Sequence, residues 1–179
     1  MNDPVKDSIC NGFFPDDNLL IRRQATLSLT EGDEKEVKDY IDKYISIRKE
    51  NSAFEAAIAT SLAGIYSEAG ILDKAEEYYR QTLSLEPENP TIMNNLAWFL
   101  IDMDQNINEG MELIDKALEL SPDVDYMLDT KGWGLYKQGK YKEALEFLQK
   151  SWDLKPIYNH EGYLHLEAAK KAVASQKNN

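Results

Sequence analysis

The chain has 179 residues, 42% of them hydrophobic, which suits a globular protein with a sizeable core. Its 32 acidic and 20 basic residues give a net charge of -12, which argues against partners that are nucleic acids or anionic membrane surfaces. The single cysteine, Cys10, excludes an internal disulfide.

Targeting signals are not evident in the sequence. The first ten residues are polar, unlike a signal peptide, and the longest apolar run, Ala97–Ile101, is too short to cross a bilayer. We therefore expect a soluble protein without direct membrane insertion. The cytoplasm is the default location, and a periplasmic or secreted mature form stays open.

In chain order, residues 1–17 are expected to form an irregular tail, and residues 18–50 a divergent first helix pair. The helix pair is expected because Ala25, Gly32 and Val37 have the same spacing as three residues of the next segment, Ala63, Gly70 and Ala75. Apolar residues at these intervals are typical of packed helices.

The middle of the chain repeats itself with a period of about 34 residues, the length of a helix–turn–helix repeat. Three sets of markers share this period: Ala63, Ala97 and Gly132; Ala75, Gly110 and Ala144; and Pro87, Pro122 and Pro156. The period predicts three helix pairs, over 56–89, 90–124 and 125–158. The small residues are expected where two helices cross closely.

Turn signals separate the helices of each pair. Gly70 and Gly139 stand where a helix end needs a residue in the left-handed conformation. Asp73, Asn89 and Asn106 are placed to cap the helices that follow them.

Residues 159–179 read as one more helix that caps the stack and forms a continuous repeat domain with the rest. Its two histidines, His160 and His165, lie five residues apart and point to different sides, whereas Glu161 and His165 share a face. Half a metal site and a solvated face are both compatible with this pair, and the solvated face is favoured. We expect no metal, no cofactor and no catalytic residue, so the chain is not expected to be an enzyme.

The markers resemble the signature of the tetratricopeptide repeat family, W-x2-L-G-x2-Y, A-x3-F and P. The slots are filled in three repeats, by Leu62, Ala63, Tyr66, Ala75, Tyr79 and Pro87; by Leu96, Ala97, Leu100, Gly110, Ile114 and Pro122; and by Gly132, Leu135, Ala144, Leu148 and Pro156. The initial Trp slot departs from the signature and holds Ala59, Met93 and Leu128. The resemblance implies an all-α fold, a right-handed superhelical stack of antiparallel helix pairs.

In this family the first helix of each repeat lines a concave groove. Carried over by position, the expected groove residues are Thr60, Asn94, Trp98, Ile101, Asp102, Tyr126, Asp129, Trp133, Tyr136 and Lys137. Trp98 and Trp133 occupy equivalent places and are expected to stand next to each other. They can bind a partner or pack between helices, and both interpretations stay open.

The resemblance implies a protein–protein interaction scaffold that binds a peptide or helix of a partner in the groove. One subclass grips the C-terminal carboxylate of chaperones, but Thr60 and Gly64 stand at two of the corresponding positions, so that clamp is not expected. An apolar and basic partner is favoured. The alternatives are an accessory repeat domain of a larger enzyme or assembly, and a self-association module; the oligomeric state is open.

Lys131 breaks the pattern, because the other repeats have Leu62 and Leu96 at its position. Its side chain can run along apolar surface with the ammonium in water, or it can meet a carboxylate of the preceding repeat. The first arrangement is favoured.

Overall fold

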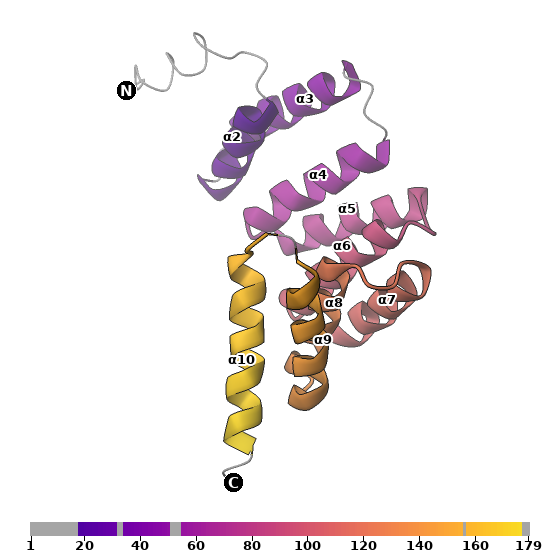
Figure 1. The fold of residues 1–179 in the computed structure, drawn as a ribbon. Coiled ribbons are helices and arrows are strands. Elements are labelled where there is room, and N and C mark those ends of the chain that lie inside the picture. Colours follow the sequence, from indigo (N-terminus) through magenta and orange to yellow (C-terminus); the bar gives the residue numbers. More distant parts are fainter. Residues whose placement is uncertain (1–17, 32–33, 51–54, 156, 177–179) are drawn as a thin grey trace. The chain divides into compact units, whose positions relative to one another are not determined.

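A computed structural model describes residues 18–31, 34–50, 55–155 and 157–176, and these segments form helices and no strand (Figure 1). The helices are α2 (Asn18–Glu31), α3 (Glu34–Glu50), α4 (Glu55–Glu68), α5 (Leu72–Leu85), α6 (Pro90–Asp102), α7 (Ile107–Leu120), α8 (Asp125–Lys137), α9 (Tyr141–Leu154) and α10 (His160–Gln176). The predicted all-α class is therefore confirmed. The predicted tail over 1–17 and Cys10 lie outside the described residues.

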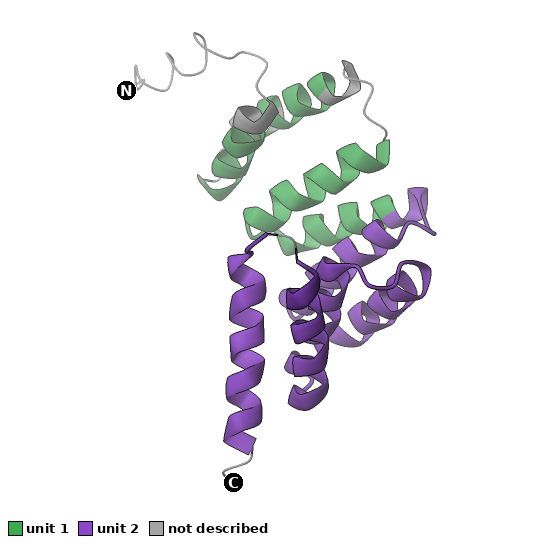
Figure 2. Ribbon diagram, in the orientation of Figure 1, with its two compact units in different colours: residues 1–82 green, residues 83–179 purple. Residues whose placement is uncertain are grey.

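The chain divides into two compact units, residues 1–82 and 83–179 (Figure 2). The boundary falls inside α5 and thus within the repeat predicted over 56–89. The repeat spacing does not indicate this division, and the predicted repeat ranges remain a proposal about how the chain is organised.

Most of the predicted turns and caps are present. Gly70 and Gly139 have φ angles of 75° and 78°, the left-handed conformation that favours glycine. The side chain of Asn89 accepts hydrogen bonds from the first turn of α6, and Asn106 accepts from the first turn of α7. The prediction for Asp73 is wrong by two positions, because α5 begins at Leu72, so that Ile71 precedes the helix and Asp73 lies within its first turn.

Small residues allow the helices of unit 2 to cross closely. A Cβ atom on Gly132 would lie 2.6 Å from Cγ of Leu148, and one on Gly110 would lie 2.7 Å from Cγ1 of Ile101. Both separations are shorter than a van der Waals contact. The glycines therefore set how near α8 comes to α9 and α6 comes to α7.

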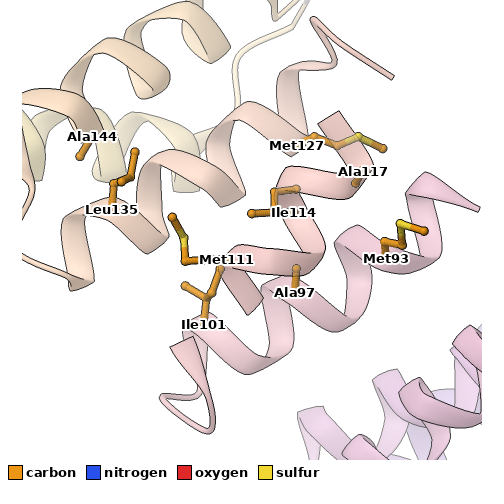
Figure 3. Close-up of a cluster of buried hydrophobic side chains, with 9 residues drawn as sticks. All are labelled: Met93, Ala97, Ile101, Met111, Ile114, Ala117, Met127, Leu135 and Ala144. Atoms are coloured by element: carbon orange, nitrogen blue, oxygen red, sulfur yellow. The ribbon is translucent and has the colours of Figure 1, made fainter. Parts of the chain in front are cut away.

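The core of unit 2 lies between these helices (Figure 3). Its buried members come from four consecutive helices: Met93, Ala97 and Ile101; Met111, Ile114 and Ala117; Met127 and Leu135; and Ala144. Because each helix contributes to this one cluster, α6 to α9 share a continuous core and do not form two separate hairpins.

Unit 1 has its own core, formed by α2, α3 and α4. The buried residues are Ala25, Ile41, Tyr44, Ile47, Ile58, Leu62 and Ile65. Tyr66 and Tyr78 stack beside this core with ring centroids 5.5 Å apart, which ties α4 to the unit 1 part of α5.

Helix α10 packs on α9 with few buried side chains. Leu166 and Ala169 join Leu148 in a small cluster, and the other buried residues of α10 are Gly162 and His165. Burying one leucine contributes roughly 2 kcal/mol. Tyr136, Leu145 and Trp152 pack around this cluster and add to the attachment of the helix.

Lys131 is paired, contrary to the favoured arrangement. Its Nζ donates to a carboxylate oxygen of Asp115 on α7, and its side chain is only 13% exposed. Asp115 itself is largely exposed, so the ion pair stays near water and avoids the cost of burying an unpaired ammonium.

The crossing at Gly132 yields a stability prediction. Gly132→Ala should lower the free energy of unfolding by about 1–3 kcal/mol, because the new methyl group overlaps Leu148 and the backbone nitrogen of that residue. Urea denaturation followed by circular dichroism measures the change. Gly64→Ala is the matched control, since its Cβ would meet only the flexible end of Arg22. Equal effects of the two variants would contradict a close crossing at Gly132.

A second prediction concerns alkaline pH and Tyr79 on α5. Burial raises the pKa of Tyr79 above its ordinary value of 10.0, with a smaller opposing contribution from the charge of Arg22. The unfolded chain therefore loses this proton first. Stability that is present below pH 10.0 should decrease as the pH rises through the higher folded-state pKa.

Urea denaturation at increasing pH, with tyrosinate absorbance recorded in parallel, tests this expectation. Tyr79→Phe should flatten the dependence, because phenylalanine has no proton to lose. An unchanged slope in Tyr79→Phe would show that other groups cause the alkaline loss.

Candidate functional site

Two stripes of side chains run along α6 and α8 of unit 2, the helices predicted to line the groove. Along each helix the members are four residues apart, so they lie one above the other on one face. The stripe on α6 is Asn94, Trp98 and Asp102, and the stripe on α8 is Asp129, Trp133 and Lys137. Both stripes thus place a polar side chain, then an indole, then a charged side chain.

Polar contacts join the two stripes at the C-terminal ends of the helices. The indole Nε1 of Trp133 donates to Oδ1 of Asp102 at 3.1 Å, and Nζ of Lys137 donates to the backbone oxygen of Asp102 at 2.8 Å. Lys137 also pairs with Asp104 at 2.9 Å. These contacts hold the indole of Trp133 in one orientation.

A series of ring contacts crosses the stripes. Trp133 stacks on Tyr136 with centroids 4.9 Å apart, and Tyr136 contacts Tyr141 at 5.2 Å. On the other side, Trp133 stacks on His165 of α10 at 4.2 Å, and His165 contacts Trp98 at 5.6 Å. The two tryptophans thus meet through the imidazole of His165, which the sequence did not indicate.

His165 also makes the central polar contact of the site. Its Nδ1 lies 2.9 Å from Oδ2 of Asp129, and both side chains are buried. The carboxylate accepts this hydrogen bond, so Nδ1 carries the proton. The solvated face favoured for His165 is therefore wrong, although the exposed neighbour Glu161 fits that interpretation.

Asp129 and Asn94 each keep one acceptor without a donor in the part of the chain that the structure describes. These atoms are Oδ1 of Asp129 and Oδ1 of Asn94, in residues that are 8% and 6% exposed. A Cβ atom on Gly162 of α10 would lie 3.3 Å from Oδ1 of Asp129, so α10 covers this oxygen. A buried acceptor without a donor is unfavourable, which marks the place as functional or strained.

At the N-terminal ends of the helices, the hydroxyl groups of Tyr126 and Thr91 lie 3.2 Å apart. Lys155, which follows α9, pairs with Asp125 at 3.2 Å. Tyr126 is 41% exposed, so it presents an accessible ring at this end of the stripes.

One of the ten expected groove residues lies in the core of unit 2, and another belongs to unit 1. Ile101 has no exposed area and belongs to the core of unit 2, so its assignment to a binding surface is corrected. Thr60 lies in unit 1 on α4, and its hydroxyl donates to the backbone oxygen of Ala56 at 2.8 Å. The remaining eight residues lie on α6 and α8.

Unit 1 contains a separate depression of about 520 Å³ that sequence reasoning missed. Its lining is Arg22, Arg23, Thr26, Leu27, Thr30 and Glu68. Arg22 forms an ion pair with Glu68 across it. The ion pair leaves Nε of Arg22 buried without a hydrogen-bond partner among the described residues.

Among the side chains that the structure describes, no group of three or more histidine, cysteine, aspartate or glutamate residues could hold a metal ion. In the same part of the chain, every helix is too short or too polar to span a bilayer.

Comparison with known proteins identifies the family. A family model described as tetratricopeptide repeat matches residues 23–157. A TPR repeat-containing protein of Pseudomonas aeruginosa is 36% identical over 95 residues, and the mitochondrial import receptor subunit TOM70 of Homo sapiens is 30% identical over 81 residues. These matches cover 53% and 45% of the chain but only 16% and 13% of the two relatives, so the chain spans a small part of their lengths.

Solved structures show the same fold. The TPR domain of Sgt2 from Aspergillus fumigatus superimposes with a TM-score of 0.63 at 21% identity, covering 70% of this chain and 83% of that domain. The first TPR domain of Spaghetti (RPAP3), solved with a bound HSP90 peptide, superimposes with a TM-score of 0.59 at 20% identity, covering 67% and 96%. Together with the family match over most of its length, these likenesses establish that the chain belongs to the tetratricopeptide repeat family.

Proposed function

We propose that this protein is a protein–protein interaction scaffold and that the stripes on α6 and α8 bind a segment of a partner protein. The observation that carries the proposal is the pair of partly exposed indoles, Trp98 and Trp133, at equivalent places on the two helices. Tryptophan removes a large apolar area from water on binding and keeps a polar N–H group, so it contributes strongly to interfaces.

The charge of unit 2 favours a basic and apolar partner. Residues 90–124 contain seven acidic residues and one basic residue, a net charge of -6. Residues 125–158 contain five acidic and six basic residues, so they are nearly neutral. An acidic field beside aromatic side chains speeds the encounter with a basic segment, and salt weakens it.

A TPR neighbour with a bound peptide supports this mode of binding in general. The Spaghetti domain holds an acidic HSP90 peptide, SRMEEVD. Here Thr60 and Gly64 take two of the positions where a carboxylate-gripping subclass has basic or amide side chains, and Asp102 and Asp129 lie in the stripes. The proposed ligand is therefore a basic segment instead of an acidic one.

Self-association is a second candidate, favoured by one observation on the outer side of unit 2. Ile157, Tyr158 and Leu164 are 79%, 64% and 52% exposed at and before the start of α10. Exposed apolar side chains that lie close together often mark interfaces. Sedimentation velocity of the purified chain separates this candidate from a monomeric scaffold.

Photo-crosslinking tests the principal proposal. A benzophenone amino acid at position 98 should crosslink a partner in cells of the source organism, and mass spectrometry would identify it. With the purified partner, Trp98→Ala and Trp133→Ala should each weaken binding roughly tenfold or more, measured by calorimetry.

Leu120→Ala is the control, because Leu120 is an exposed side chain on α7 that lies outside the stripes and α10. Circular dichroism must first establish that each variant is folded. Equal affinity of the folded Trp98, Trp133 and Leu120 variants would rule out the proposed surface.

A further inference from the structure

The site on α8 carries a carboxylate whose charge is not balanced by a lysine or arginine within the described residues. Three lysines on α8 and after α9 form ion pairs with other carboxylates: Lys131 with Asp115, Lys137 with Asp104 and Lys155 with Asp125. Asp129 pairs only with His165, and its Oδ1 remains without a donor. A buried carboxylate in this state favours a cation with several N–H donors.

The shape of the site adds a second requirement. The imidazole of His165 lies nearly parallel to the indole of Trp133, at an interplanar angle of 18°, while its edge donates to Asp129. The occupant must therefore be flat, must stack on an indole, and must donate hydrogen bonds in its own plane. Arginine meets all three conditions, because its guanidinium is planar, always charged, and carries five donors.

We propose that Asp129 and Trp133 form a binding subsite for an arginine side chain of the partner, and that His165 of α10 occupies this subsite in the free protein. The imidazole stands in for the guanidinium, with one N–H donor in place of several. This inference rests on the proposed function and specifies the side chain that the groove selects.

Asn94 extends the subsite onto α6. It stands in the preceding repeat at the position equivalent to Asp129, and it lies one turn before Trp98 as Asp129 lies one turn before Trp133. Its Oδ1 is also a buried acceptor without a donor among the described residues. A guanidinium can satisfy both carboxylate oxygens of Asp129 and still present N–H groups toward a neighbouring acceptor, whereas a lysine ammonium has no plane to stack.

Arginine binding then requires α10 to move. Gly162 covers Oδ1 of Asp129 and His165 holds Oδ2, so both oxygens are inaccessible while α10 is in place. The buried apolar side chains of α10 in this contact are Leu166 and Ala169, and Tyr136, Leu145 and Trp152 pack around them, so a ligand must displace these contacts together with the imidazole. The C-terminal helix therefore competes with the partner for one site.

Titration of the full chain with a pentapeptide that has arginine between pairs of alanines tests the inference. The indole N–H signals of Trp98 and Trp133 are followed by NMR against an added reference compound, and that of Trp152, which contacts Tyr163 of α10, reports displacement of the helix. His165→Ala should bind this peptide about tenfold more tightly than the wild type, because the competitor is gone. His160→Ala, which changes the exposed histidine of the same helix, should match the wild type.

Peptides with lysine or with neutral, isosteric citrulline should bind His165→Ala roughly tenfold more weakly than the arginine peptide. Adding Asp129→Asn to His165→Ala should remove this preference. Ala169→Glu provides an independent route, because it detaches α10 at its contact with α9 and leaves the subsite intact. It should also tighten arginine binding.

Equal binding of the arginine and citrulline peptides, or no gain in either His165→Ala or Ala169→Glu, would overturn the inference. This failure is distinguishable from failure of the proposed function. If folded Trp98→Ala and Trp133→Ala still lose the crosslinked partner, the scaffold proposal stands and only the arginine subsite is wrong.

Discussion

The closeness of the helix crossings in unit 2 determines how α6 and α8 present the two indoles of the candidate site. Gly132 lets α8 meet Leu148 of α9 without room for a methyl group, and Gly110 does the same for α7 against Ile101. Because Trp133 directly follows Gly132 in the helix, the crossing that buries the glycine turns the indole to a neighbouring face. Ala97 and Trp98 stand in the same relation on α6, so one packing rule places both indoles.

The resulting surface combines aromatic rings with the acidic side chains of Asp102 and Asp129. The C-terminal helix α10 covers part of this surface. Trp133 is fixed by Asp102 on one edge and by Tyr136 on one face, which leaves its other face for His165. The same imidazole satisfies one oxygen of Asp129. In the proposed arginine subsite, this helix would control the access of a partner.

Much of the fold follows from the sequence. The period of the small residues reflects how helices pack. The helix ends reflect local rules of capping, as at Gly70, Gly139, Asn89 and Asn106. The stripes follow as well, because positions 35 residues apart are equivalent in the repeat, as for Asn94 and Asp129. Three features depend on tertiary contacts that no local pattern encodes: the position of His165 against Trp133, the pairing of Lys131 with Asp115, and the full burial of Ile101.

The contact between His165 and Asp129 is the central claim, and a double-mutant cycle on α10 tests it most directly. Hydrogen exchange of α10 amides measures the free energy of opening in the wild type, His165→Ala, Asp129→Asn and the double variant. If the two side chains hold α10 together, each single variant loosens the helix and the second change adds little, with a coupling energy of about 1 kcal/mol or more. Additive effects of the two substitutions would show that His165 and Asp129 act independently and that their contact does not hold α10 in place.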